Sequence, residues 1–172
     1  MSSRCVFASF FRHSFGTLFP LLALTLFAGG CSSTGEVRKE PRLRVVETTL
    51  AKGIDDTGTE IVPIEPTTIF STEDPEVVCY VKLRNLSGKH RLRWAWYDPA
   101  GNLYYSTKSY SVAIPRGKYV EDAIAWHEIS LRGESAQEYP GSWKVDIYLD
   151  EAYLASNFFH IVPARAGPCL SP

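Results

Sequence analysis

Apolar and polar residues alternate with a period of two in three stretches of this chain, and this pattern restricts the fold more than any other feature. The stretches are VVCYVKLRN (77–85), HRLRWAWYD (90–98) and GSWKVDIYLD (141–150). Such alternation predicts antiparallel strands with one face in the core and the other toward solvent. We therefore expect an all-β protein. Its buried side chains should include Trp94, Trp96, Trp143, Val81 and Leu83.

Turn-forming residues separate the predicted strands at short intervals. The turns are NLSGKH (85–90), DPAGN (98–102), YPGSW (139–143) and the short DEA (150–152). Further strands are expected at 43–50, 60–70, 103–112, 118–131 and 153–162. Seven or eight strands with frequent turns predict a two-sheet antiparallel sandwich.

Three segments resemble the immunoglobulin-like domains of bacterial envelope proteins. They are TEDPEVVCYVKLRN (72–85), WAWYDPAGNLYY (94–105) and PGSWKVDIYLDEAYLASNFFHIV (140–162). The shared pattern is a tryptophan strand, an Asp-Pro-x-Gly hairpin and a Pro-Gly-x-Trp that opens the penultimate strand. The resemblance implies an immunoglobulin-like fold, although the cysteine pair of antibody domains is not reproduced. It implies no activity, because a fold does not determine a function.

The first thirty residues differ in character from the rest of the chain. Arg4 and Arg12 precede an apolar stretch at 17–30 that contains no charge. This stretch is about 14 residues long, whereas a membrane-spanning helix needs about 20. A positive start, a short apolar centre and small residues at the end are typical of a secretory signal peptide. We therefore assign 1–30 to a signal peptide.

The segment FAGGC, which ends at Cys31, resembles the lipobox of bacterial lipoproteins. The family pattern prefers leucine where this chain has Ala28. The resemblance implies that Cys31 is acylated and becomes the new N-terminus, palmitate being the expected kind of chain. Two or more acyl chains give stable membrane anchoring. The alternative is an ordinary secreted protein with an incidental cysteine. Ser32, rather than aspartate, implies an outer-membrane location facing the periplasm.

Residues 31–42 show no apolar periodicity and are expected to form a flexible tether. The sandwich domain should then occupy 43–163, followed by a tail at 164–172. Without Arg4 and Arg12 the mature chain has 16 basic and 19 acidic side chains, a net charge of −3. This balance gives no reason to expect nucleic acid as a partner.

No motif for catalysis stands out, so we expect a non-catalytic protein without a cofactor. The histidines and cysteines lack the short spacings of metal sites, and no G-x-S-x-G or phosphate-binding loop occurs. Cys79 and Cys169 form a possible disulfide in an oxidising compartment. The alternative is that Cys79, on an apolar strand face, is a buried thiol.

The candidate binding residues are Arg91, Arg93, Tyr97, Tyr104 and Tyr105. The turn at 98–102 makes their strands neighbours, which is expected to place them on one exposed sheet face. Arginine and aromatic residues are enriched in protein interfaces, so the leading hypothesis is binding to another envelope protein. A carbohydrate or peptidoglycan ligand is the alternative. A third interpretation is that the aromatic pairs only stabilise the sheet.

Overall fold

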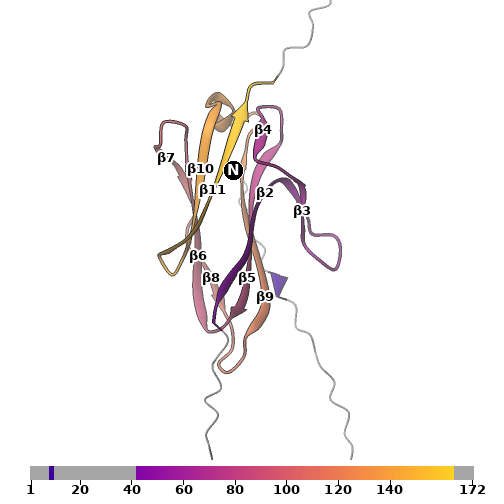
Figure 1. The fold of residues 1–172 in the computed structure, drawn as a ribbon, viewed down its shortest axis with the longest axis vertical. Coiled ribbons are helices and arrows are strands. Elements are labelled where there is room, and N and C mark those ends of the chain that lie inside the picture. The colour runs from indigo at the N-terminus through magenta and orange to yellow at the C-terminus, as the bar shows by residue number, and fades with distance from the viewer. Residues whose placement is uncertain (1–7, 10–41, 165–172) are drawn as a thin grey trace, which may run out of the picture.

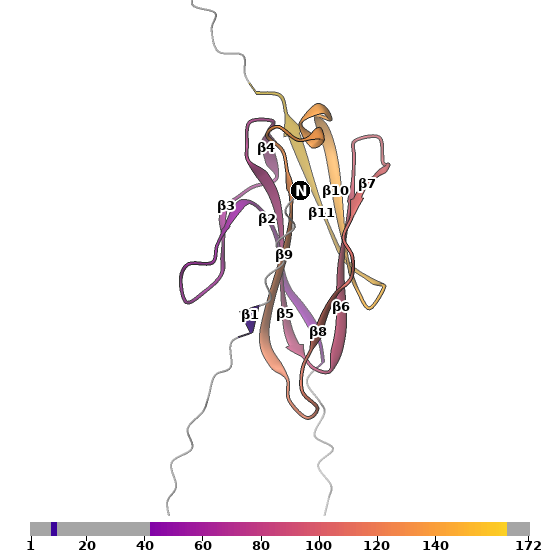
Figure 2. The same ribbon diagram turned by 180° about the vertical axis from the view of Figure 1, so that it is seen from behind.

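The computed structural model describes residues 8–9 and 42–164, which form two β-sheets packed face to face (Figures 1 and 2). Sheet A has the strand order β1-β9-β5-β2-β3. These strands are β1 (Ala8–Ser9), β9 (Val120–Ser130), β5 (Glu76–Leu86), β2 (Arg44–Asp55) and β3 (Val62–Pro66). The expected all-β architecture of two sheets is therefore confirmed.

Sheet B has the order β4-β11-β10-β6-β7, and β8 also pairs with β6. Its strands are β4 (Ile69–Ser71), β11 (Ala152–Val162), β10 (Gly141–Leu149), β6 (Lys89–Tyr97), β7 (Leu103–Ser106) and β8 (Tyr110–Ala113). A single 3₁₀ turn, η1 (Ser135–Glu138), precedes β10 in the described part of the chain. The pairing of β4 with β11 is parallel, whereas a wholly antiparallel sandwich was expected.

Two of the predicted strands are each divided in the structure. The segment 60–70 forms β3 in sheet A and β4 in sheet B, because the chain crosses between the sheets at 67–68. The segment 103–112 forms β7 and β8, which are separated at Thr107. The Thr107 amide donates to the Trp94 carbonyl oxygen at 2.9 Å, and Thr107 Oγ1 accepts from the Trp94 amide at 3.0 Å. The threonine side chain thus replaces strand pairing at this point.

The core lies between the two sheets and is rich in aromatic rings. Trp94, Trp96 and Trp143 are fully buried there, as predicted, together with Val81 and Leu83. The residues of this core and those packed on it all lie between 43 and 161. The core of the described part of the chain therefore lies within residues 43–161.

A second apolar cluster lies on the other face of sheet A. Because Val78 and Tyr80 alternate with Val81 and Leu83, the pattern predicts that they face solvent. Both are instead buried with Ile61, Ile124 and Trp126. Ile61 lies in the connection between β2 and β3. Alternation within a single strand cannot predict where a residue of such a connection packs.

In the part of the chain that the structure describes, no helix has the length and apolar character needed to span a membrane.

Candidate binding surface

The structure divides the five candidate binding residues between the two faces of sheet B. Arg91, Arg93 and Tyr97 lie on the outward face of β6, as predicted. Tyr105 instead turns inward and stacks on His127, with ring centroids 5.5 Å apart. Tyr104 packs edge to face on Trp143, with ring centroids 5.0 Å apart.

An irregularity in strand register explains why the two tyrosines leave the outward face. Tyr105 is opposite Trp96, and Leu103 is opposite Tyr97, so Tyr104 is an additional residue in β7. Tyr105 follows the inward direction of Trp96, and Leu103 takes the outward position instead. The expectation that all five residues share one exposed face is therefore wrong for Tyr104 and Tyr105.

The outward face of sheet B carries aromatic residues in two rows that cross the strands. One row consists of Leu103, Tyr97, Lys144 and Phe158, which are directly opposite one another on β7, β6, β10 and β11. The other row consists of Arg93, Tyr148 and Tyr153. Between them lies a row of small residues, Ala95, Asp146 and Ser156. We call these ten residues the outer patch.

Each cation of the outer patch lies over a tyrosine ring. Lys144 Nζ is 4.3 Å from the ring centroid of Tyr97, and Arg93 Cζ is 4.1 Å from that of Tyr148. Such cation–π contacts contribute roughly 0.5–1 kcal/mol at exposed sites. These contacts hold the four side chains in defined positions.

Asp146 is the buried polar centre of the outer patch. Its carboxylate accepts from Lys144 Nζ at 2.9 Å and from the hydroxyl of Ser156. The hydrogen bond to Asp146 raises the pKa of Lys144. Burial raises the pKa of Tyr148. At neutral pH, Tyr148 is therefore neutral and Lys144 is charged.

Three apolar side chains of the outer patch remain open to solvent. Phe158 is 67% exposed, Tyr153 is 62% exposed and Leu103 is 58% exposed. The alternation in the sequence places Tyr148 on the outward side of its strand. Tyr148, Tyr153 and Phe158 were nevertheless not among the predicted binding residues. Tyr148 could have been selected from the sequence, because its alternation with Ile147 and Leu149 predicts an outward side chain.

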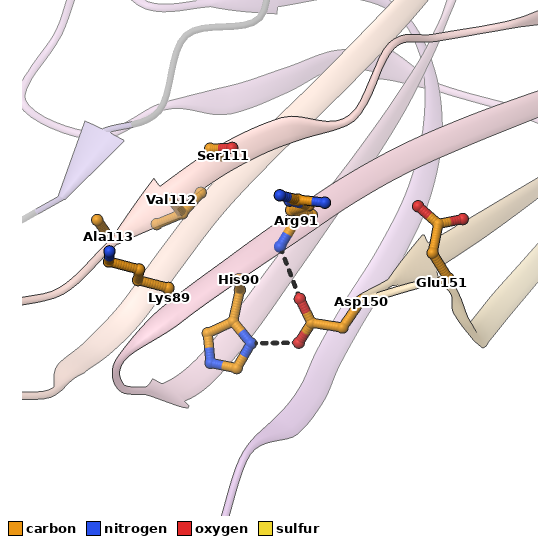
Figure 3. A pocket seen from close by; sticks show the side chains of 8 residues that line it. All are labelled: Lys89, His90, Arg91, Ser111, Val112, Ala113, Asp150 and Glu151. Carbon is orange, nitrogen blue, oxygen red and sulfur yellow. Dashed lines mark hydrogen bonds and ion pairs between the residues drawn. The ribbon is translucent and has the colours of Figure 1, made fainter.

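A hollow of about 600 Å³ lies beside the outer patch, between β6, β8 and the β10–β11 turn (Figure 3). His90 and Asp150 face each other in it, with His90 Nδ1 2.7 Å from Asp150 Oδ2. The Arg91 amide donates to Asp150 Oδ1 at 2.8 Å. Burial opposes ionisation of Asp150, but the hydrogen bonds from His90 and Arg91 outweigh it and lower the pKa of the carboxyl.

Arg93 connects the hollow to the outer patch. Its guanidinium forms an ion pair with Glu151 at 3.2 Å, and Glu151 also accepts from the Ser109 hydroxyl at 3.2 Å. Both carboxylates of the hollow therefore already have partners, and they fix the β10–β11 turn against β6. This arrangement holds the surface around the turn in place.

His127 is a buried histidine that sequence reasoning did not distinguish from the others. Its Nδ1 accepts from Trp96 Nε1 at 3.1 Å, and Nε2 has no hydrogen-bond partner among the described residues. Burial lowers the pKa of His127 to about 4. The ring is thus neutral at pH 7 and belongs to the core.

Cys79 is a buried free thiol in the structure. Burial raises its pKa to about 12, and its sulfur lies 3.6 Å from Asn157 Nδ2. A thiol with so high a pKa is unreactive. Cys31 and Cys169 lie outside the described residues, so the acylation of Cys31 and the pairing of Cys79 with Cys169 stay predictions.

The comparisons with known proteins concern architecture. No protein-family profile matches the chain, and no curated protein matches it in sequence. Among solved structures, it is similar to an immunoglobulin-like protein from Pseudomonas aeruginosa, with 12% identity and a TM-score of 0.43 over 72% of this chain and 99% of that one. It is also similar to the Pseudomonas fluorescens alkylpurine DNA glycosylase AlkC bound to DNA containing an abasic site analog, with 10% identity and a TM-score of 0.45. That match covers 70% of this chain and 30% of the glycosylase.

Proposed function

We propose that this chain is a non-catalytic lipoprotein of the bacterial envelope and that its sandwich binds another protein through the outer patch. Acylation at Cys31 would anchor it, and the outer membrane facing the periplasm is the location that Ser32 favours. The observation that carries the binding proposal is the set of exposed apolar side chains beside cation-supported tyrosines on one sheet face.

The composition of the outer patch supports a protein partner. Aromatic residues and arginine carry much of the binding energy in protein interfaces, whereas lysine and acidic residues are depleted there. Phe158, Tyr153 and Leu103 offer exposed apolar area, and the ion pair with Glu151 holds Arg93 in position. A side chain that is already held in place loses less entropy when it is buried in a complex.

A glycan is the second candidate, and the exposed rings of Phe158 and Tyr153 favour it. Rings this exposed offer flat faces on which a sugar can stack. The rings of Tyr97 and Tyr148 are less suited to stacking, because Lys144 and Arg93 cover one face of each. We therefore rank the protein partner first.

The binding proposal is tested with the double variant Tyr153→Ala/Phe158→Ala in the full-length protein. Partners are cross-linked in intact cells, captured from detergent-solubilised envelopes and identified by mass spectrometry. We expect the variant to lose a partner that the wild type captures, while its melting temperature changes little, because both side chains are exposed. The matched control is Tyr119→Ala/Tyr139→Ala, which removes two exposed tyrosines elsewhere.

Equal capture by the wild type and the Tyr153→Ala/Phe158→Ala variant would rule out the outer patch as the binding surface. The glycan candidate has a separate test, the retention of the domain on purified peptidoglycan. Retention that the double variant loses would favour the glycan over the protein partner.

The anchor has its own test. Labelled fatty acid should enter the wild-type protein and should not enter Cys31→Ser, which should remain in the aqueous phase of a detergent extract. A wild-type protein without label would exclude acylation at Cys31 while leaving the binding proposal open.

A further inference from the structure

The sandwich is elongated along its strands, and different turns form its two ends (Figures 1 and 2). At one end, the first residues of β2 lie beside the last residues of β5, where Arg44 is opposite Arg84. The β8–β9 connection reaches the same end, because the Ile114 amide donates to the Gly88 carbonyl oxygen at 2.7 Å. The tether assigned to 31–42 joins the sandwich here, so we call residues 42–44, 84–89 and 113–122 the tether end.

The opposite end is built from the β4–β5 connection, the β6–β7 turn and the segment that contains η1. The Leu131 amide donates to the Pro75 carbonyl oxygen at 2.9 Å. The Tyr104 hydroxyl, beside the β6–β7 turn, is hydrogen-bonded to the Ser135 hydroxyl at 2.8 Å. We call residues 72–76, 98–102 and 130–139 the distal end.

The two ends carry opposite charges. The tether end has six basic and two acidic side chains, a net charge of +4, and the distal end has one basic and six acidic side chains, a net charge of −5. The charged residues of the tether end are Arg42, Arg44, Arg84, Lys89, Arg116, Lys118, Glu121 and Asp122. Those of the distal end are Arg132, Glu73, Asp74, Glu76, Asp98, Glu134 and Glu138.

Most of the positive charge of the tether end is not neutralised within the sandwich. Asp122 pairs with Lys82 and Arg84. Asp150, which is close to this end, is held by His90 and by the Arg91 amide. Four cations are exposed and form no ion pair with a described residue: Arg42, Arg44, Lys89 and Arg116.

We propose that the tether end docks on the anionic lipid surface of the membrane that holds the anchor, so that the distal end points away from it. This inference rests on the acylation of Cys31 proposed above. The chain from Cys31 to Arg42 has 11 links and reaches at most about 40 Å. An acylated Cys31 therefore keeps the tether end, rather than the distal end, close to the lipid.

The charges of both ends favour this one orientation. Each lysine or arginine near an anionic membrane strengthens binding roughly fivefold. The attraction acts over about 8 Å, the Debye length at physiological salt. β5 has 11 residues and separates the two ends by about 35 Å, so the acidic distal end is then beyond the range of repulsion. The reverse orientation would bring six acidic side chains to an anionic surface.

The test uses the acylated protein purified from envelopes, after mass spectrometry has established the acyl chains on Cys31. It is placed in nanodiscs of phosphatidylcholine alone or of phosphatidylcholine and phosphatidylglycerol in a three-to-one ratio. The amides at 86–89 and 113–119 should exchange more slowly in the anionic nanodiscs, and those at 98–102 should not change. High salt should remove the difference, because the Debye length falls to about 3 Å at 1 M.

Two double variants with the same loss of charge test the location of the contact. Lys89→Gln/Arg116→Gln removes two cations of the tether end, which should weaken docking about 25-fold and abolish the protection. Lys108→Gln/Arg132→Gln removes two cations elsewhere and should retain it. All four side chains are exposed, so both variants should fold. If either does not, the comparison of lipids and salt on the wild type decides.

Equal exchange in the two kinds of nanodisc would overturn the docking inference and leave the anchor and the outer patch as proposed. Protection that persists in folded Lys89→Gln/Arg116→Gln would do the same. A purified protein without acyl chains would overturn the anchor and this inference together. Protection that appears only when purified peptidoglycan is added would also overturn it, because the partner of the tether end would then be the cell wall.

Discussion

His127 is the residue whose behaviour depends most on its surroundings. It lies opposite Cys79 in the sheet, and its ring is enclosed by Trp94, Trp96 and Tyr105. Nδ1 is an acceptor for Trp96, so the single proton of the neutral ring is on Nε2, which has no partner among the described residues. Protonation would place a charge in this apolar setting, and would also remove the acceptor for Trp96.

We predict that His127 makes the domain less stable in acid. Its pKa is about 4 in the folded protein, against 6.5 for an unperturbed histidine side chain, so the unfolded chain binds the proton more tightly. The contribution is fully present above about pH 6.5 and is lost as the pH falls to about 4. It amounts to roughly 3 kcal/mol at about 1.4 kcal/mol for each pH unit.

The measurement is the free energy of unfolding by urea between pH 4 and 7.5 for the wild type and for His127→Phe. The variant should be less stable at pH 7.5, because Trp96 loses its acceptor, but its stability should fall less between pH 6.5 and 4. Parallel pH profiles for the two proteins would show that other groups cause the acid sensitivity.

The beginning of β10 shows how an element depends on a neighbouring turn. Gly141 has a φ of 139°, a conformation that side chains rarely adopt. A Cβ atom at Gly141 would lie 3.0 Å from two carbons of Pro99, in the β6–β7 turn. Glycine at this position therefore serves both the backbone conformation and the close approach of the turn.

We predict that Gly141→Ala destabilises the domain more than Gly88→Ala does. Gly88 also has a positive φ, 82°, but a Cβ atom there would have no neighbour within 4 Å. Gly88→Ala should thus cost only the backbone strain, about 1–2 kcal/mol. Gly141→Ala should cost more because Pro99 must also move, and chemical denaturation of both variants checks the difference. Equal losses would mean that the β6–β7 turn moves aside without cost.

The whole molecule is held together by rings that pack between the two sheets. Trp143 of β10 is edge to face with Tyr104 of β7 and stacks on Phe159 of β11, and its Nε1 donates to the Tyr139 carbonyl oxygen at 2.8 Å. One side chain therefore joins three strands and the segment that follows η1.

We predict that Trp143→Ala lowers the free energy of unfolding by about 3–5 kcal/mol, the usual cost of truncating a buried aromatic residue. This is a large part of the roughly 5–15 kcal/mol that stabilises a domain, so the variant should be unfolded or close to it at 37 °C. Guanidinium denaturation followed by circular dichroism gives the value. An unchanged transition midpoint would contradict the role assigned to this ring.

The sequence alone was sufficient to predict most of the strands and the aromatic core between the two sheets. Alternation is a local property, because successive side chains of a strand point to opposite faces whatever the strand pairs with. For this reason Trp94, Trp96 and Trp143 could be placed in the core, and the β10–β11 turn could be located at Asp150 and Glu151. The all-β, two-sheet architecture was predicted on the same basis.

The tertiary structure alone decided which residues share a surface. The position of Tyr105 depends on an irregular register between β6 and β7, and the split at Thr107 depends on hydrogen bonds to Trp94, a residue 13 positions away. The outer patch brings together β6, β7, β10 and β11, which become neighbours only through the strand order of sheet B. Alternation within a strand cannot determine these features, because they depend on which strands become neighbours and in which register they pair.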